Sequence, residues 1–343
     1  MEPRVIQTLS KQRDSGTIVE LVENEAGFRF VVKRILNLEE PIYRAIFQKE
    51  TQALTRLKAC ENIVRIFRSD IQISPNGRSE GIISMEYVPG RPLARVLDTI
   101  PNASTRYFLV KQLTNAIRHA HQNSVIHRDI NPSNILITDT FELKLIDFGI
   151  AKIRGMFQDG TTYQFATQNY SAPEVTIHSE NATERSDIYS LGAVIYFLFT
   201  GEVPVTTSEM PLAIQSAGGI DVKLKEVLLK MCAPSPADRY ENIDDCELAL
   251  APLYQRYCGS DERYYFAVPT NALDELKNRN LVRKNTHYQE LLNDFLPSQF
   301  TGGLIRRRVG GDTPIYCFDG ISISMGCVLS DDFFQVIRFR RLD

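Results

Sequence analysis

A cluster of polar residues set between short apolar runs constrains the fold of this chain more than any other feature. Residues 127–134 read His-Arg-Asp-Ile-Asn-Pro-Ser-Asn, and residues 147–149 read Asp-Phe-Gly. Two short runs with the composition of β-strands, 135–137 and 143–146, stand between these motifs. Alone, Asp-Phe-Gly is a common turn and carries little information. Its position after an apolar strand, downstream of a complete His-Arg-Asp loop, makes chance a poor explanation.

The two motifs together resemble those of the protein kinase family. The resemblance implies that Asp129 is the catalytic aspartate, which accepts or orients the proton of the acceptor hydroxyl. It also implies that Asn134 and Asp147 hold Mg²⁺ on the phosphates of ATP, a role that suits their hard oxygen atoms. The expected activity is transfer of the γ-phosphoryl group of ATP to a serine or threonine hydroxyl of a protein.

A lysine inside an apolar strand needs an anionic partner. Lys33 lies in the strand expected at 28–35, and the helix expected at 41–60 has an inward apolar stripe that includes Glu50. Because each charge offsets the other's desolvation cost, we expect Lys33 and Glu50 to form an ion pair. Protein kinases use such a pair to hold the α- and β-phosphates. The alternative is a lysine that reaches out to water beside a glutamate at the rim.

The same resemblance implies a nucleotide pocket built from the phosphate-covering loop, the lysine strand, the linker between the lobes and the strand after the catalytic loop. The expected nucleotide-binding residues are Gly16, Ile18, Val31, Lys33, Met85, Glu86, Val88, Leu136 and Asp147. Their apolar members would form a slot for a purine ring. The chain departs from the family here, because only the third glycine of the glycine-rich loop, Gly16, remains.

Asn131 is a second departure from the family pattern. Ser/Thr kinases usually carry a lysine at this position, whereas a neutral amide donates a hydrogen bond without a charge. We therefore expect Asn131 to belong to the catalytic residues but to support slow turnover. The two departures keep open the hypothesis of a pseudokinase scaffold that binds nucleotide weakly. A third hypothesis is a phosphotransferase that acts on small molecules.

The segment before Glu174 favours serine or threonine over tyrosine as the acceptor. Residues 167–171 read Thr-Gln-Asn-Tyr-Ser, which reproduces the spacing of Ser/Thr kinases. By resemblance, Thr167 bonds the catalytic loop and Glu174 pairs with Arg239, while Asp187 braces the backbone of the His-Arg-Asp motif. The pair of Glu174 and Arg239 supports a peptide-binding platform, which argues against a small-molecule acceptor.

The polar stretch between Gly149 and Ala172 is typical of an activation loop. It contains Thr161 and Thr162, and Arg128 is positioned in the sequence to meet a phosphate there. We expect autophosphorylation at Thr161 or Thr162. The alternative is a solvated loop whose threonines have no such role.

The predicted organisation has three parts and belongs to the α+β class. We expect a two-lobed protein kinase fold with a small β-rich lobe at 1–88, a larger helical lobe at 89–258, and a small α+β extension of unknown function at 259–343. The expected strands of the small lobe are 17–22, 28–35 and 81–88. The expected helices of the larger lobe are 103–122, 188–200, 221–232 and 242–254. In the extension we expect helices at 271–279 and 288–295 and strands at 303–309, 314–329 and 333–341.

Composition and charge disfavour several other classes. The 343 residues are 43% hydrophobic and carry a net charge of −3, so the chain can bury a large core and has no global attraction to nucleic acids. The six cysteines are scattered and form no Cys-x-x-Cys pair, and no apolar run is long enough to cross a bilayer. We therefore expect a cytoplasmic protein with no membrane partner. The arginine-rich runs 306–308 and 338–341 could bind an acidic partner or a nucleic-acid backbone, but a solvated strand face is the simpler interpretation.

Overall fold

The computed structural model describes residues 3–12, 16–74, 77–148, 169–177, 181–204, 206 and 208–258, together with four strands of the C-terminal region. The chain divides into two compact units. The first comprises Met1–Ile100, Leu109–Thr138 and Glu142–Pro252, and the second comprises Pro101–Phe108, Asp139–Phe141 and Leu253–Asp343.

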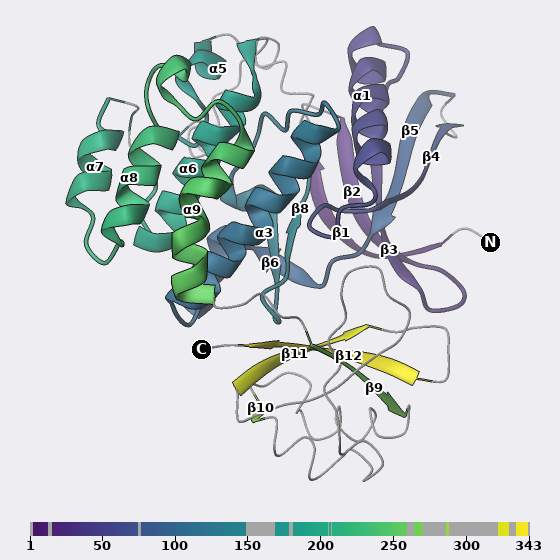
Figure 1. The fold of residues 1–343 in the computed structure, drawn as a ribbon. Coiled ribbons are helices and arrows are strands. Elements are labelled where there is room, and N and C mark those ends of the chain that lie inside the picture. The colour runs from purple at the N-terminus through teal and green to yellow at the C-terminus, as the bar shows by residue number, and fades with distance from the viewer. Residues whose placement is uncertain are drawn as a thin grey trace. The chain divides into compact units, whose positions relative to one another are not determined.

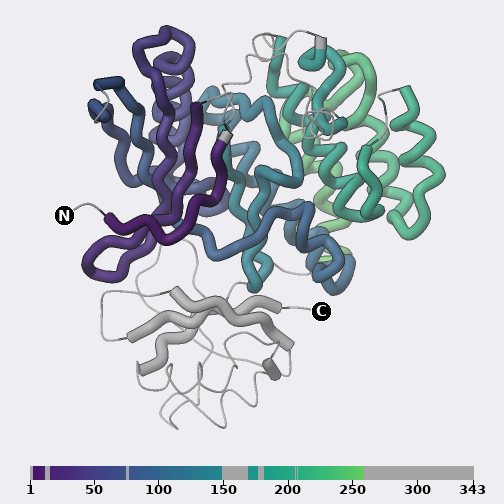
Figure 2. The backbone as a smooth tube through the Cα atoms, turned by 180° about the vertical axis from the view of Figure 1, so that it is seen from behind, coloured from purple at the N-terminus to yellow at the C-terminus, as the bar shows by residue number. Residues whose placement is uncertain are grey.

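A five-stranded antiparallel sheet forms the small lobe of the first unit (Figure 1). Its strands follow the order β1-β2-β3-β5-β4, so that β1 and β4 are the edges and the lysine strand β3 is central. Figure 2 follows the same chain from behind, beginning with β1 and β2 in purple. The strands are β1 (Arg4–Gln12), β2 (Thr17–Glu23), β3 (Arg29–Ile35), β4 (Ile66–Ile73) and β5 (Ser79–Glu86).

Helix α1 (Pro41–Leu57) packs its apolar stripe on this sheet (Figure 1). Pro41 suits the first turn, where a missing N–H costs nothing. The ring of Phe47 lies directly on Gly81 of β5, and a Cβ atom there would lie 2.7 Å from Cγ of Phe47. The absence of a side chain at Gly81 therefore permits the close approach of α1 to the sheet. Glu50 is buried on the same stripe.

The larger lobe is helical and is organised around α6 (Glu184–Thr200), which is buried from Ser186 to Leu198. A capping box on Thr183 starts α6, and Gly201 in the left-handed conformation ends it. Helix α8 packs against both α6 and α7. The other helices are α2 (Leu93–Val96), α3 (Ala103–Gln122), α5 (Pro173–Ile177), α7 (Met210–Ser216), α8 (Val222–Met231) and α9 (Ile243–Cys258).

A three-stranded antiparallel sheet carries the polar motifs. Its strands are β6 (Gly90–Pro92), β7 (Ile135–Thr138) and β8 (Leu143–Leu145), in the order β6-β7-β8. The short 3₁₀ turn η2 (Pro132–Asn134) leads into β7, and Asp147 follows β8. The pairing of β7 with β8 therefore brings the end of the His-Arg-Asp loop close to the Asp-Phe-Gly motif.

The second unit contains a four-stranded antiparallel sheet in the order β10-β11-β12-β9. Its strands are β9 (Tyr264–Pro269), β10 (Thr286–His287), β11 (Ser322–Val328) and β12 (Phe334–Arg341). Strands β11 and β12 lie within the strands expected at 314–329 and 333–341. The helices expected at 271–279 and 288–295 and the strand expected at 303–309 lie outside the described residues.

The two-lobed α+β fold expected from the sequence is confirmed. The expected helix 103–122 coincides with α3, and the other expected helices of the larger lobe match α6, α8 and α9 with end shifts of a few residues. The edge strands β1 and β4 and the short helix α7 were not expected. Within the described residues, no helix combines the length and the apolar character that crossing a bilayer requires.

Candidate active site

Asp187 holds the backbone of the His-Arg-Asp motif from the first turn of α6. Its buried carboxylate accepts hydrogen bonds from the backbone N–H groups of His127 at 2.8 Å and Arg128 at 2.9 Å. Arg128 has φ of 70°, a conformation that costs energy for a residue with a side chain. The bracing contact expected for Asp187 is therefore present, and it stabilises a backbone conformation that the chain would otherwise avoid.

Asp129 and Asn134 are joined inside the loop. The amide Nδ2 of Asn134 lies 2.9 Å from both the backbone oxygen and Oδ2 of Asp129. Both residues are at most 9% exposed. Ile146 donates its N–H to the backbone oxygen of Asn134 at 2.9 Å, which ties this residue to the segment just before Asp147. Hydrogen bonds thus join Asp129 to Asn134 and tie Asn134 to the residue that precedes Asp147.

Asn131 lies in the same loop and is 2% exposed. Its side-chain oxygen accepts the backbone N–H of Ser133 at 2.9 Å, and its Nδ2 donates to the backbone oxygen of Asp129 at 3.0 Å. Both polar ends of this amide are therefore engaged within the loop.

Lys33 forms the ion pair with Glu50 that the sequence predicts. Its Nζ lies 2.6 Å from Oε1 of Glu50 and 2.9 Å from Oδ1 of Asp147, so one ammonium bridges two carboxylates. Burial alone would lower the pKa of Lys33, but the charges of Asp147 and Glu50 outweigh it and hold the pKa above the ordinary value. The ammonium therefore stays charged.

His127 is fully buried and links the two motifs. Its Nδ1 accepts the N–H of Asp129 at 3.3 Å, so the ring proton lies on Nε2, which faces the backbone oxygen of Ile146 at 3.3 Å. The ring packs on Phe148 with a centroid separation of 4.6 Å. Burial lowers the pKa of His127 below its usual value despite nearby carboxylates. The ring is therefore a neutral spacer between the two motifs.

The expected adenine-binding residues come from four strands and the linker. Val31 of β3 pairs with Met85 of β5, and both are buried, as is Val88. Ile18 is on β2 and Leu136 is on β7. Glu86 ends β5, where its side chain accepts from Lys144 Nζ at 2.7 Å and from the backbone N–H of Arg65 at 2.8 Å.

Gly16 ends the loop that leads into β2, with φ of 58°, and its carbonyl accepts the N–H of Leu36 at 2.9 Å. A left-handed residue at this position favours glycine. Residues 13–15 of the same loop lie outside the described residues, as do Gly149, Thr161, Thr162 and Thr167.

The donor chemistry of the site fits a magnesium nucleotide. Asp147 and Asn134 supply hard oxygen atoms, and Lys33 supplies a fixed positive charge. The described residues contain no group of three or more His, Cys, Asp or Glu side chains that could hold a metal by themselves. A metal held here would therefore need further oxygen ligands from phosphates or water, as Mg²⁺ commonly does.

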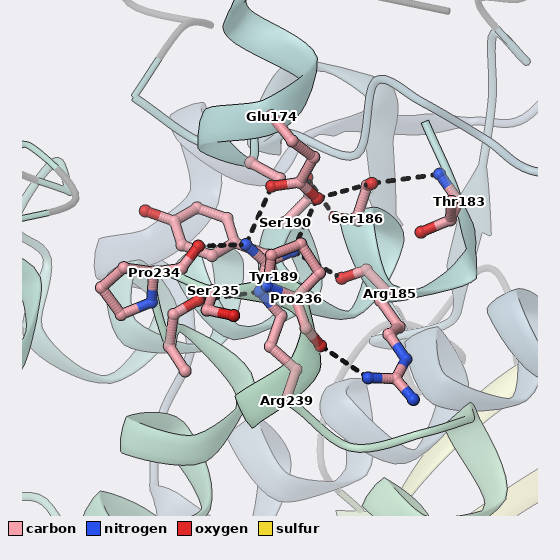
Figure 3. A network of polar contacts seen from close by, with 12 residues as sticks. Glu174, Thr183, Arg185, Ser186, Tyr189, Ser190, Pro234, Ser235, Pro236 and Arg239 are labelled. Atoms are coloured by element: carbon pink, nitrogen blue, oxygen red, sulfur yellow. Dashed lines mark hydrogen bonds and ion pairs between the residues drawn. The ribbon is translucent and has the colours of Figure 1, made fainter. Parts of the chain in front are cut away.

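A second polar network joins three separate elements of the larger lobe (Figure 3). The guanidinium of Arg239 binds both carboxylate oxygens of Glu174, at 2.7 and 2.9 Å. Its other N–H groups donate, at 2.8 to 3.0 Å, to the backbone oxygens of Ala233, Pro234 and Arg185. Burial alone would raise the pKa of Glu174, but hydrogen bonds from Arg239 and Ser186 outweigh it and hold the pKa below the ordinary value.

Two residues of these networks were missed from the sequence. His121, at the end of α3, contacts Oδ2 of Asp187 at 2.9 Å through Nε2. Ser186 donates to Oε1 of Glu174 at 2.7 Å and accepts the N–H of Thr183, and so connects the Glu174 network to the start of α6. In the sequence, the two residues are marked only by their positions: Ser186 is next to Asp187, and His121 precedes the His-Arg-Asp motif.

Comparison with known proteins agrees with this geometry. The family model described as "Protein kinase domain" matches residues 13–244. The chain is 30% identical to Serine/threonine-protein kinase PrkC of Bacillus subtilis over 283 residues, which cover 77% of this chain and 42% of that protein. It is 32% identical to Serine/threonine-protein kinase PknB of Mycobacterium tuberculosis over 256 residues, which cover 69% and 40%. The chain thus spans about two fifths of the length of these relatives.

Proposed function

This chain belongs to the protein kinase family, and from that premise we propose that it transfers the γ-phosphoryl group of ATP to serine or threonine hydroxyls of proteins. The observation that carries the proposal is the convergence of Lys33, Glu50 and Asp147, with both contacts of Lys33 within 3 Å. A partly buried cation held by two carboxylates is suited to the phosphates of a nucleotide.

In this proposal Asp129 orients the acceptor hydroxyl and takes its proton. The hydroxyl oxygen forms a bond to the γ-phosphorus while the bond from that phosphorus to the bridging oxygen breaks, and ADP leaves. Asn134 and Asp147 would hold Mg²⁺, which would neutralise charge on the phosphates. Lys33 orients the α- and β-phosphates, and Glu50 orients Lys33.

The adenine ring would lie in the apolar slot lined by Val31, Met85 and Leu136, with Ile18 above it. Burial of Val31 and Met85 supports this assignment, since a purine ring is stabilised between apolar side chains. Backbone groups of Glu86 and Val88 would contact the edge of the ring, and Gly16 would approach the phosphates without a Cβ atom.

The acceptor is proposed to be a serine or threonine of a protein rather than a small molecule. The named relatives are Ser/Thr protein kinases, and the network of Glu174 and Arg239 supports a platform that binds peptide next to the site. Four cysteines of the described residues are free thiols, which supports a cytoplasmic location, where thiols stay reduced.

We also propose autophosphorylation at Thr161 or Thr162. Arg128 supports it, because its Nε is buried and has no hydrogen-bond partner among the described residues. A phosphate would supply acceptors for this group. Mass spectrometry after incubation with Mg-ATP should find phosphate on residues 155–167, and its absence there, with transfer to other proteins intact, would contradict the assignment.

The decisive experiment compares the wild type with Asp129→Asn, using γ-radiolabelled ATP and a generic basic protein. We expect transfer to serine or threonine by the wild type and a fall of about 10²–10⁴-fold in the variant, because the proton acceptor is lost. Asp139→Asn is the matched control, since Asp139 is an exposed aspartate of the turn before β8. A wild type that binds ATP but transfers no phosphate would instead indicate a pseudokinase.

A further inference from the structure

Asn131 has the geometry of a clamp within the catalytic loop. The residue caps the 3₁₀ turn η2 with an extended backbone, φ −154° and ψ 163°, and its side-chain oxygen accepts the N–H of Ser133. Its Nδ2 reaches back to the backbone oxygen of Asp129. One side chain therefore bonds the loop on both sides of itself, two residues before and two residues after.

The backbone oxygen of Asp129 receives two amide donors. Nδ2 of Asn134 lies 2.9 Å from it, and Nδ2 of Asn131 lies 3.0 Å from it. The Nδ2 of Asn134 also faces Oδ2 of Asp129. Asn134 is in addition the proposed metal ligand. The two bonds of Asn131 are both internal to the loop, and its 2% exposure leaves almost no surface for a ligand.

We propose that Asn131 is a positioning residue, which acts on phosphoryl transfer through Asp129 and makes no contact with the nucleotide. The expected effect on the rate of transfer rests on the proposed function, whereas the two hydrogen bonds of Asn131 do not. The clamp fixes the peptide group that follows Asp129, and so limits rotation of the segment that carries the carboxylate. A misplacement of about 1 Å in a catalytic group can cost about 10²-fold in rate, which is why a remote hydrogen bond can matter.

Three substitutions separate the two halves of the clamp. Asn131→Ala removes both bonds. Asn131→Ser and Asn131→Asp keep an oxygen that can accept the N–H of Ser133. Both lose the amide Nδ2 that reaches the backbone oxygen of Asp129, because a carboxylate has no donor and the serine hydroxyl ends one atom earlier. Asn24→Ala is the matched control, because Oδ1 of Asn24 accepts the N–H of Ala26, also two residues on, in an exposed turn of the small lobe.

We expect Asn131→Ala to lower kcat by about 10-fold to 10²-fold, with KM for ATP changed by less than about twofold. The ratio of rates with ATP and with its γ-thio analogue should stay at the wild-type value, because Asn131 does not touch the γ-phosphoryl group. Asn131→Ser should lie between the wild type and Asn131→Ala, since half of the clamp remains. The Asn24→Ala control should retain the wild-type kcat.

Hydrogen exchange of the full chain tests the clamp without any turnover. The amide of Ser133 should exchange faster in Asn131→Ala than in the wild type, and should stay protected in Asn131→Ser. Unchanged exchange would overturn the clamp, even if the wild type proved inactive. A raised KM for ATP at constant kcat, or a changed ratio with the γ-thio analogue, would overturn the positioning role. A wild type without transfer activity contradicts the proposed function instead.

Discussion

The Nζ atom of Lys33 lies 2.9 Å from Oδ1 of Asp147, although 114 residues separate them in the sequence. The same ammonium lies 2.6 Å from Glu50 on α1. A strand, a helix and the Asp-Phe-Gly motif therefore meet at one cation, whose side chain is 12% exposed. Substitution of Lys33 should therefore affect both stability and activity.

Replacement of Lys33 by methionine should abolish phosphoryl transfer and destabilise the fold. Glu50, whose side chain is 5% exposed, would lose its neutralising charge, a change that typically costs about 3–5 kcal/mol in the free energy of unfolding. Chemical denaturation measures this cost. The double variant Lys33→Met with Glu50→Leu should regain stability but not activity. Recovery of activity in that variant would contradict the role proposed for Lys33.

Gly81→Ala should disturb the site through α1. The new Cβ atom would overlap the ring of Phe47, so that the ring or the helix must shift, at a cost of about 1–3 kcal/mol. Because Glu50 lies on the same helix, activity should fall more than stability alone predicts. In a background of Phe47→Leu the same change should cost less. Equal costs in both backgrounds, measured by denaturation, would show that the contact is unimportant.

Arg239→Lys should destabilise the larger lobe although it keeps the charge. The guanidinium makes five hydrogen bonds in a planar arrangement, which an ammonium cannot reproduce. Loss of several bonds at a side chain with no exposed surface should lower the free energy of unfolding by about 3 kcal/mol. Arg185→Lys, with one bond from its side chain, is the milder control. If Arg239→Lys destabilised the protein no more than Arg185→Lys does, the hydrogen bonds of Arg239 would not contribute to stability as proposed.

The free energy of unfolding should decrease as the pH drops below about 6.5, and protonation of His127 should account for part of this decrease. Because burial lowers the pKa of His127 in the folded state, the unfolded chain binds the proton more readily, and protonation favours unfolding. The stability that neutral His127 contributes is fully present at a pH above 6.5, the ordinary pKa of histidine, and is lost as the pH falls below it. Free energies of unfolding at about pH 7.5 and about pH 5.5 should differ less in His127→Phe than in the wild type. An equal difference would contradict the assignment.

Much of the fold follows from local sequence patterns. The helix expected at 103–122 coincides with α3, and the strands expected at 17–22 and 28–35 correspond to β2 and β3. These elements have a buried face, so their apolar periodicity is visible in the sequence. Strand β1 has no such signal, because its described residues are exposed or nearly so at the edge of the sheet, and β4 buries only Ile66. Both strands therefore escaped prediction.

From the sequence alone, the two-lobed fold, the family motifs and the pairing of Lys33 with Glu50 could be predicted, since a charge on an apolar face needs an opposite one. Three contacts became visible only in the folded protein: Asp147 shares the ammonium of Lys33, His121 contacts Asp187, and Ser186 donates to Glu174. The same holds for the amide of Asn131, which bonds back onto its own loop. The physical reason is that a short polar side chain has several partners within reach, and the choice depends on which backbone groups the packed elements bring to it.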